Sequence, residues 1–295
     1  MGFPKRIKLF ALLGDAYGEF RKNGPLRLAG ATSFFATFAL PAVLIILIQV
    51  FGLFVSHRVM AKQLLQSISE VIGYNTASDL RKTLVKVHHL PGNRWVSAGI
   101  FLFLIFVATT SFKVIKDSLN QLWNIKVEDH AGLAFNLLDR VKSFIVILAA
   151  GILFLTVLLG EGLIHLLKHS EGAQFQNSSL FMNGFLKQII SIVVVTAWFT
   201  SVFKFLPDAR PSWKVAITGA FFTSMLFTIG KWLIIWLLTL SNMQDIYGAS
   251  ASSVLLLLFV FYCSFIFYYG ACFTKVWADF HNSPIGPGKH ASVNP

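Results

Sequence analysis

Three ionisable side chains lie within apolar stretches of the sequence, where they could do chemistry. Lys231 interrupts the run from Trp213 to Leu240, and Glu161 lies near the end of another run with His165 four residues later. A separation of four residues places Glu161 and His165 on one face of a helix. If these runs cross a membrane, such groups bind substrate, pair with one another or relay protons. Lys231, Glu161 and His165 are therefore candidate substrate-binding or ion-binding residues.

Each candidate also has a structural interpretation. Lys231 and Glu161 could reach the same depth and form a static ion pair, or Lys231 could extend its amino group to the membrane surface. His165 could be a packed or interfacial histidine. Glu161 and His165 are only two potential ligands, whereas zinc sites use three or four. The sequence therefore predicts no metal site and no cofactor.

The elements that would position these residues are six long apolar stretches. A bilayer core of roughly 30 Å needs about 20 helical residues, which these stretches match or approach. Hydrophobic residues make up 55% of the chain, charged residues 13%, and the mean hydropathy is +0.67. The sequence predicts an all-α, polytopic membrane protein whose six transmembrane helices cover approximately 29–55, 95–112, 143–167, 185–206, 213–240 and 249–277.

The net charge of +12 follows the expected topology. With the N-terminus inside, the cytoplasmic segments hold about twice as many Lys and Arg residues as the outer ones, so the positive-inside rule favours N-in and C-in. Basic charge then orients the protein, and no nucleic acid is expected as a partner. The predicted organisation begins with a cytoplasmic amphipathic segment, 1–28, and ends with a disordered cytoplasmic tail, 281–295. Between them lies the membrane domain, 29–280, which contains an outer loop at 56–94 and a cytoplasmic connector at 113–142.

Short amphipathic helices are predicted outside the six stretches. Phe10, Leu13, Tyr17 and Phe20 recur at helical spacing among basic residues, which suits a helix on the anionic cytoplasmic leaflet or one packed under the bundle. The loop 56–94 contains two further apolar stripes, separated near residue 73. These two helices would lie on the outer membrane surface or cap the bundle.

Several motifs occur in order along the chain. The first stretch carries Ala31-Thr-Ser-Phe-Phe-Ala-Thr-Phe-Ala-Leu-Pro41, and Lys116-Asp-Ser-Leu-Asn-Gln-Leu-Trp123 follows the second. Leu206-Pro-Asp-Ala-Arg210 precedes the fifth, and Gly270-Ala-Cys-Phe-Thr274 lies in the sixth. Together these motifs resemble the YihY/BrkB family of bacterial inner-membrane proteins over nearly the whole chain. Cys272 departs from the family pattern, which often has an acidic residue there.

The resemblance implies a multi-pass protein of the bacterial inner membrane. Its motif residues in this chain are Pro41, Asp117, Asn120, Trp123, Pro207, Arg210, Gly219, Tyr247, Gly248 and Gly270. Structural roles are predicted for most of them. Pro41 kinks its helix, Asp117 and Asn120 cap or cross-link helices, Trp123 anchors the membrane interface, and the glycines allow close helix contacts.

Two functions remain open. One is transport, flipping or export of an amphiphilic, anionic envelope molecule, a role suspected for some family members. Polar residues within the spans would serve it, namely Ser33, Thr37, Thr196, Thr200 and Thr223. No phosphate-binding loop motif occurs, so an ATPase in this chain is not expected. The other is a non-transporting scaffold or assembly factor in envelope biogenesis, with an envelope protein or a second copy as partner besides membrane lipids.

Some family members carry an old ribonuclease label, but the acids Asp117, Glu128, Asp129 and Asp139 lack the spacing of a nuclease site. No enzymatic activity is expected.

Overall fold

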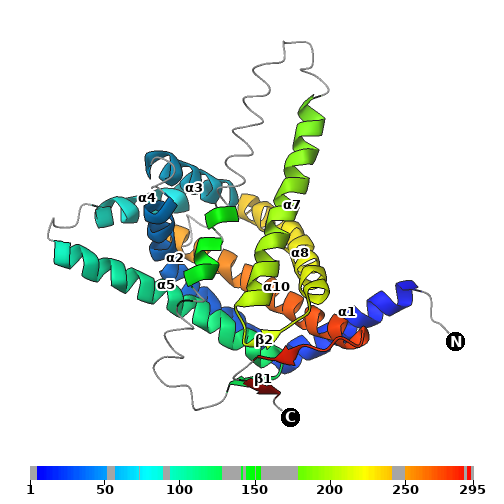
Figure 1. The fold of residues 1–295 in the computed structure, drawn as a ribbon. Coiled ribbons are helices and arrows are strands. Elements are labelled where there is room, and N and C mark those ends of the chain that lie inside the picture. The colour runs from blue at the N-terminus through cyan, green and yellow to red at the C-terminus, as the bar shows by residue number, and fades with distance from the viewer. Residues whose placement is uncertain are drawn as a thin grey trace.

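The computed structural model describes residues 5–51, 57–72, 74–88, 94–127, 141, 144–149, 151–153, 179–240, 250–288 and 291–293. Long helices of 27 to 30 residues dominate this part of the chain (Figure 1). They are α2 (Pro25–Phe51), α5 (Arg94–Leu122), α7 (Ser179–Phe205), α8 (Trp213–Leu240) and α10 (Ala251–Phe280).

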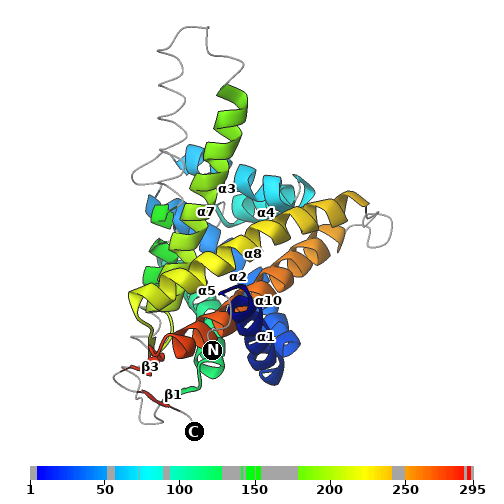
Figure 2. The same cartoon turned by 90° about the vertical axis from the view of Figure 1, so that its right-hand side faces the viewer.

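Shorter elements lie at the two ends of these helices. The shorter helices are α1 (Lys5–Lys22), α3 (His57–Ile72) and α4 (Tyr74–His88). The strands are β1 (Ile125–Val127), β2 (Ala209–Arg210), β3 (Gly286–Pro287) and β4 (Ala291–Val293). We call the end of the bundle that carries the strands the strand end; α3 and α4 lie at the opposite end (Figures 1 and 2).

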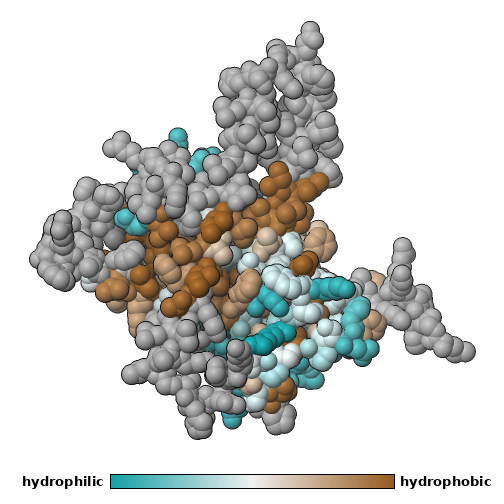
Figure 3. Space-filling view, viewed as in Figure 1, coloured by the Kyte–Doolittle hydropathy of each residue, from teal (hydrophilic) through white to brown (hydrophobic). Residues whose placement is uncertain are grey.

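Within the described residues, four helices are long and apolar enough to cross a membrane, and they lie in α2, α7, α8 and α10. The second predicted stretch lies in α5, and a shorter apolar helix, Phe144–Leu153, lies in the third. Hydrophobic side chains form a broad band across one face of the molecule, with hydrophilic side chains below it toward the strand end (Figure 3). The prediction of a helical, multi-pass membrane protein is confirmed, while six crossings and their orientation remain predictions.

Helix α10 runs between two pairs of helices and packs against both (Figure 2). One pair is α2 with α5, and the other is α7 with α8. We call these the α2–α5 arm and the α7–α8 arm. Because α10 contacts α2 and α8 closely, it is the element that joins the arms along most of their length.

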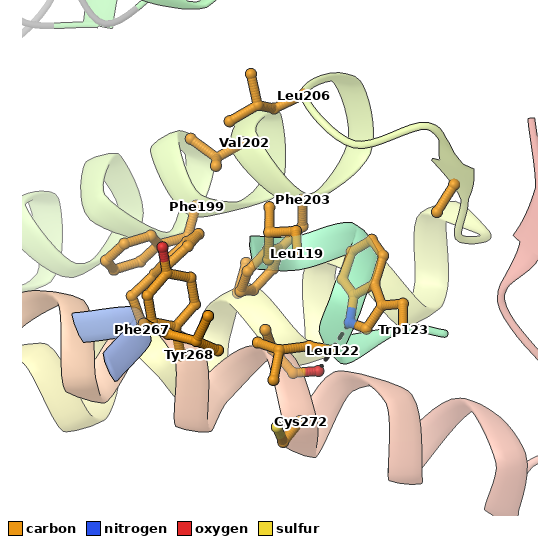
Figure 4. Packing of buried hydrophobic residues seen from close by; sticks show 14 of the residues in the cluster. Leu119, Leu122, Trp123, Phe199, Val202, Phe203, Leu206, Phe267, Tyr268 and Cys272 are labelled. Atoms are coloured by element: carbon orange, nitrogen blue, oxygen red, sulfur yellow. Dashed lines mark hydrogen bonds between the residues drawn. The ribbon is translucent and has the colours of Figure 1, made fainter. Parts of the chain in front are cut away.

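The core at the strand end is rich in aromatic side chains. Phe203 and Phe267 stack with ring centroids 5.2 Å apart, and Trp123 lies 5.9 Å from Phe203. Figure 4 shows these rings beside Leu119 and Cys272, where α5, α7 and α10 converge. Packing of this kind buries large apolar areas and fixes ring geometry.

A second core fills the opposite half of the α2–α5 arm. Ile46 and Ala108 are fully buried there, and α3 and α4 add Met60, Leu64 and Leu80. The segment predicted as an outer loop, 56–94, therefore contains two helices, and their apolar faces cap the bundle.

Helix α1 packs against α10 through a face that includes Phe20 of the predicted stripe but neither Phe10 nor Tyr17. Leu12, Ala16 and Phe20 are buried, whereas Phe10 and Tyr17 are largely exposed. The small side chain of Ala16 lets the two helices approach closely, and the Phe20 ring meets Phe265 edge to face at 4.8 Å.

The first residues of the connector predicted at 113–142 are helical, because α5 continues to Leu122 with its polar groups satisfied by tertiary partners. One prediction at the strand end was wrong in part. The tail predicted to be disordered instead forms strands in its described part. β3 pairs with β2, and β4 pairs with β1, both antiparallel.

Candidate functional site at the strand end

The last turns of α5 present a polar face to the interior. Lys116, Asn120 and Trp123 are 2%, 4% and 3% exposed. They recur at i, i+4 and i+7, which is one face of a helix. Asp117, the acidic motif residue at this end of α5, is exposed, because it lies 100° around the helix from Lys116.

Asp208, in the connector between α7 and α8, completes this polar face. Its Oδ2 lies 2.8 Å from Lys116 Nζ, in an ion pair whose side chains are 3% and 8% exposed. Asn120 Nδ2 donates to the same oxygen at 3.0 Å, and the Asp208 backbone N–H donates to Asn120 Oδ1 at 2.9 Å. We call Lys116, Asn120 and Asp208 the buried polar cluster.

The cluster balances its charge within a few ångströms. A buried ion pair stabilises a fold only when its remaining hydrogen-bonding groups also have partners. Here Asn120 supplies a further hydrogen bond to the Asp208 carboxylate. Removal of one partner from such a pair costs about 3–5 kcal/mol, since the other charge stays buried. The cluster therefore holds α5 firmly to the α7–α8 connector as long as all three residues are present.

Trp123 links α5 to α10. Its indole Nε1 donates to the carbonyl oxygen of Ala271 at 3.0 Å, drawn as the dashed line in Figure 4. Trp123 was predicted to anchor the membrane interface, but it is a buried core residue. The prediction differs from the structure because α10 offers a carbonyl at the level of the indole.

Helices α8 and α10 cross through two matched contacts. Gly219 on α8 faces Thr274, and Gly270 on α10 faces Thr223, so that a Cβ at either glycine would lie 1.9 or 2.0 Å from the threonine hydroxyl. Each threonine donates to the carbonyl of the glycine four residues earlier in its own helix at 2.7 Å. Both glycines thus permit close helix packing, as expected of small residues in membrane helices.

The remaining motif residues lie in the α7–α8 connector, in α2 or outside the described part of the chain. Pro207 is buried beside Asp208, and Arg210 is exposed in β2, where it pairs with Gly286. Pro41 lies inside α2, which is helical on both sides of it. Tyr247 and Gly248 lie outside the described residues.

The three ionisable candidates do not come together in the part of the chain that is described. Glu161 and His165 lie outside it. Lys231 is half-buried in α8, far along that helix from the buried polar cluster. Among the described residues, no three His, Cys, Asp or Glu side chains lie close enough together to hold a metal ion.

Most of the hydroxyl groups that were expected to serve transport donate hydrogen bonds within their own helices. Ser33 donates to Gly30, and Thr200 to Thr196, while Thr196 and Ser224 join α7 to α8 at 2.8 Å. The hydroxyl of Thr37 in α2 is buried without a hydrogen-bond partner among the described residues.

Sequence reasoning missed Lys116 and Asp208 as site residues. One signal was available: Lys116 lies four residues before Asn120, so a lysine and an amide share one face of the helix. Nothing in the sequence indicated that Asp208, 92 residues after Lys116, would meet both side chains.

The amino-acid sequence is similar to a family of bacterial membrane proteins. A family model described as "Virulence factor BrkB" matches residues 16–292. A UPF0761 membrane protein of Saccharophagus degradans is 25% identical over 278 residues, which are 94% of this chain and 61% of that protein. One from Glaesserella parasuis is 26% identical over 179 residues, covering 60% of each chain.

The coverage differs among relatives. A UPF0761 membrane protein of Haemophilus influenzae is 25% identical over 260 residues, which are 86% of this chain and 89% of that protein. The chain thus spans less than two thirds of the first two relatives and most of the third. No solved structure matches this chain significantly. Because the family model covers nearly all of its sequence, the chain belongs to the Virulence factor BrkB family and is a multi-pass protein of the bacterial inner membrane.

Proposed function

We propose that this protein moves an amphiphilic, anionic molecule of the cell envelope across the inner membrane, without an ATPase of its own. The observation that carries this proposal is the position of Lys231. It lies within the apolar segment Trp213–Trp232 of α8, about 13 Å along the axis from the end of the helix at Leu240. A lysine at such a depth costs about 3 kcal/mol unless a partner or water reaches it.

The described surroundings leave Lys231 open to an external anion. Ion pairs among the described residues use Lys22, Lys82, Lys116 and Lys275, and none uses Lys231. The preceding residue, Gly230, touches the Tyr262 hydroxyl of α10, since a Cβ there would lie 2.0 Å from that oxygen. A cation and a hydroxyl therefore lie at one level of the α8–α10 pair, which suits a phosphate-bearing headgroup.

A flipping assay tests the proposal. The purified protein is reconstituted into liposomes that contain fluorescent phosphatidylglycerol, and dithionite quenching reports exchange between leaflets. We expect the wild type to accelerate exchange and Lys231→Met to lose at least tenfold of that rate. Lys214→Met, an exposed lysine in the first turn of the same helix, is the matched control and should keep the wild-type rate.

Native mass spectrometry adds the identity of the molecule. An anionic lipid or glycolipid should co-purify with the wild type and decrease with Lys231→Met. Equal flipping rates in the wild type and Lys231→Met would contradict the role of this lysine. Transport itself would be contradicted if the wild type exchanged neither phosphatidylglycerol nor the co-purified lipid faster than empty liposomes do.

One observation favours the scaffold alternative. Helices α3 and α4 form an ordered pair over the bundle and present exposed residues to the outside, including Lys62, Tyr74 and Arg81. Such a surface suits an envelope protein as partner. In-cell crosslinking from Tyr74 that captures one stoichiometric protein, together with no lipid exchange, would favour this alternative.

A further inference from the structure

The C-terminal segment crosses the strand end and pairs with both connectors there. In β3, Gly286 and Pro287 pair with Arg210 and Ala209 of the α7–α8 connector. In β4, Ala291 to Val293 pairs with Val127 to Ile125, which follow α5. The segment therefore contacts the ends of both arms, although it lies far from both connectors in the sequence (Figure 1).

The same segment positions the backbone of Asp208. The N–H of Gly288 donates to the carbonyl oxygen of Asp208 at 2.7 Å. The approach is so close that a Cβ at Gly288 would lie 2.6 Å from that oxygen. Any side chain at this position must push the segment away from the connector.

Asp208 passes this contact on to the interior. Its carboxylate binds Lys116 and Asn120, so a continuous series of contacts runs from Gly288 to α5. Lys116 belongs to the α2–α5 arm and Asp208 to the α7–α8 arm. Separation of the arms at the strand end must therefore break this ion pair.

We propose that the described C-terminal residues, 282–288 and 291–293, form a strap that keeps the strand end closed by holding Asp208 on Lys116 and Asn120. The strap leaves the α7–α8 connector when the arms separate, and Lys116 then becomes available to the anionic molecule. This second part rests on the proposed transport function. Two tests separate the strap from that function.

The first test measures accessibility and needs no transport. Leu119 of α5 is fully buried in the strand-end core, where it packs with Phe203 of α7. Leu119→Cys is placed in a chain with Cys263→Ala and Cys272→Ala, reconstituted in nanodiscs and labelled with a maleimide. Gly288→Ala should accelerate labelling at least tenfold.

Gly286→Ala is the matched control, because a Cβ at Gly286 would have nothing within 4 Å. It should leave the labelling rate unchanged. Equal rates in Gly288→Ala and Gly286→Ala would overturn the strap, whether or not the protein transports lipid.

The second test locks the strap in place. Arg210 and Gly286 face one another in the antiparallel pair, where Cα atoms lie about 4.5–5.5 Å apart, within disulfide range. Arg210→Cys with Gly286→Cys, in the same background without native cysteines, should lose at least tenfold of its flipping rate on oxidation and recover it on reduction. Each single cysteine variant is the control for the oxidant.

An oxidised, cross-linked protein that flips lipid at the reduced rate would overturn the claim that the strap must leave. If the wild type flips no lipid while Gly288→Ala still accelerates labelling, the strap stands as a structural closure and the transport function falls.

Discussion

Asp208 uses every polar group it has. Its carboxylate binds Lys116 and Asn120, its N–H donates to Asn120, and its carbonyl accepts from Gly288. A buried carboxylate is tolerated only with such complete pairing, because an isolated charge in a low-dielectric interior costs many kcal/mol. One side chain thereby joins α5, the α7–α8 connector and the C-terminal segment.

Loss of one charge from this pair should cost more than loss of both. We expect Lys116→Met and Asp208→Leu each to lower the free energy of unfolding by about 3–5 kcal/mol, since each leaves one buried charge unpaired. The double variant should lose less than either single variant, because neither charge is then left buried without its partner. Unfolding in mixed micelles measures the free energy of all three variants. The control is Lys113→Met, at an exposed lysine of the same helix, which should change the free energy of unfolding by less than about 0.5 kcal/mol. Strictly additive losses would show that the two residues do not interact.

At the scale of elements, α8 and α10 are held by reciprocal glycine–threonine contacts rather than by large side chains. Gly219 receives Thr274 and Gly270 receives Thr223, so the helix axes approach closely. Membrane helices associate through such packing because lipid provides no hydrophobic drive between them. Helix α1, by contrast, binds α10 from outside through Phe20 and an ion pair.

Methyl groups at the crossing of α8 and α10 should be poorly tolerated. Gly219→Ala and Gly270→Ala should each destabilise the protein by about 1–3 kcal/mol, because the neighbouring threonine must shift. Gly99→Ala in α5, where a Cβ meets nothing within 4 Å, should be neutral or stabilising by up to about 1 kcal/mol. Thermal unfolding in detergent compares them. Restoration of stability by Thr274→Gly in the Gly219→Ala variant would identify the clash, and an equal loss in Gly99→Ala would argue against it.

The docking of α1 on α10 should depend on pH through Glu19. Its carboxylate pairs with Lys22 at 3.0 Å and Lys275 at 3.1 Å. The hydrogen bond from Lys22, aided by Lys275, outweighs partial burial and holds the pKa of Glu19 below its usual value. The resulting stability is complete above the unfolded pKa of about 4.3 and is lost as pH falls through the lower folded pKa.

Comparison with Glu19→Gln measures this contribution. The stability difference between wild type and Glu19→Gln should be constant from pH 7 down to about 5 and shrink toward zero below about pH 4. Asp15→Asn, at an exposed carboxylate of the same helix, serves as the control. A difference that grows as pH falls would contradict this role of Glu19.

For the whole molecule, the strand end gathers elements from the entire chain. α5 leads into β1 and α7 leads into β2, so both helices run toward this end, and α10 also finishes there (Figure 1). Two successive helices cannot approach the same end without an intervening return. The predicted third stretch, 143–167, would supply it, and Val146 and Ile147 are already buried in the two cores.

This arrangement, taken with the excess of Lys and Arg in the predicted cytoplasmic segments, predicts six crossings with the strand end in the cytoplasm. Lys126 in β1 and Lys62 in α3 are exposed at opposite ends of the bundle. With an impermeant maleimide, and in a chain without Cys263 and Cys272, Lys62→Cys should react in spheroplasts and Lys126→Cys only in inverted vesicles. Reaction of Lys126→Cys in spheroplasts and of Lys62→Cys only in inverted vesicles would reverse the orientation. Reaction of both from the same side would exclude a crossing by α5, which lies between them in the chain.

The sequence alone identified the membrane class and most helices, because continuous apolar runs and short polar connectors are local properties. It placed α8 at Trp213–Leu240, and it separated α3 from α4 at residue 73. It also singled out Asn120, Trp123, Gly219 and Gly270 through motifs. The roles of these residues depend on partners that lie far along the chain, and for Trp123 the predicted role was wrong.

Tertiary structure decided what local patterns cannot encode. The periodicity of α1 did not distinguish Leu12 and Ala16 from Phe10 and Tyr17, because only α10 determines which face is covered. The polar tail read as disordered, since its strands form only against β1 and β2. Lys116 and Asp208 looked like ordinary connector charges until the fold buried them together, where low dielectric and mutual pairing make each depend on the other.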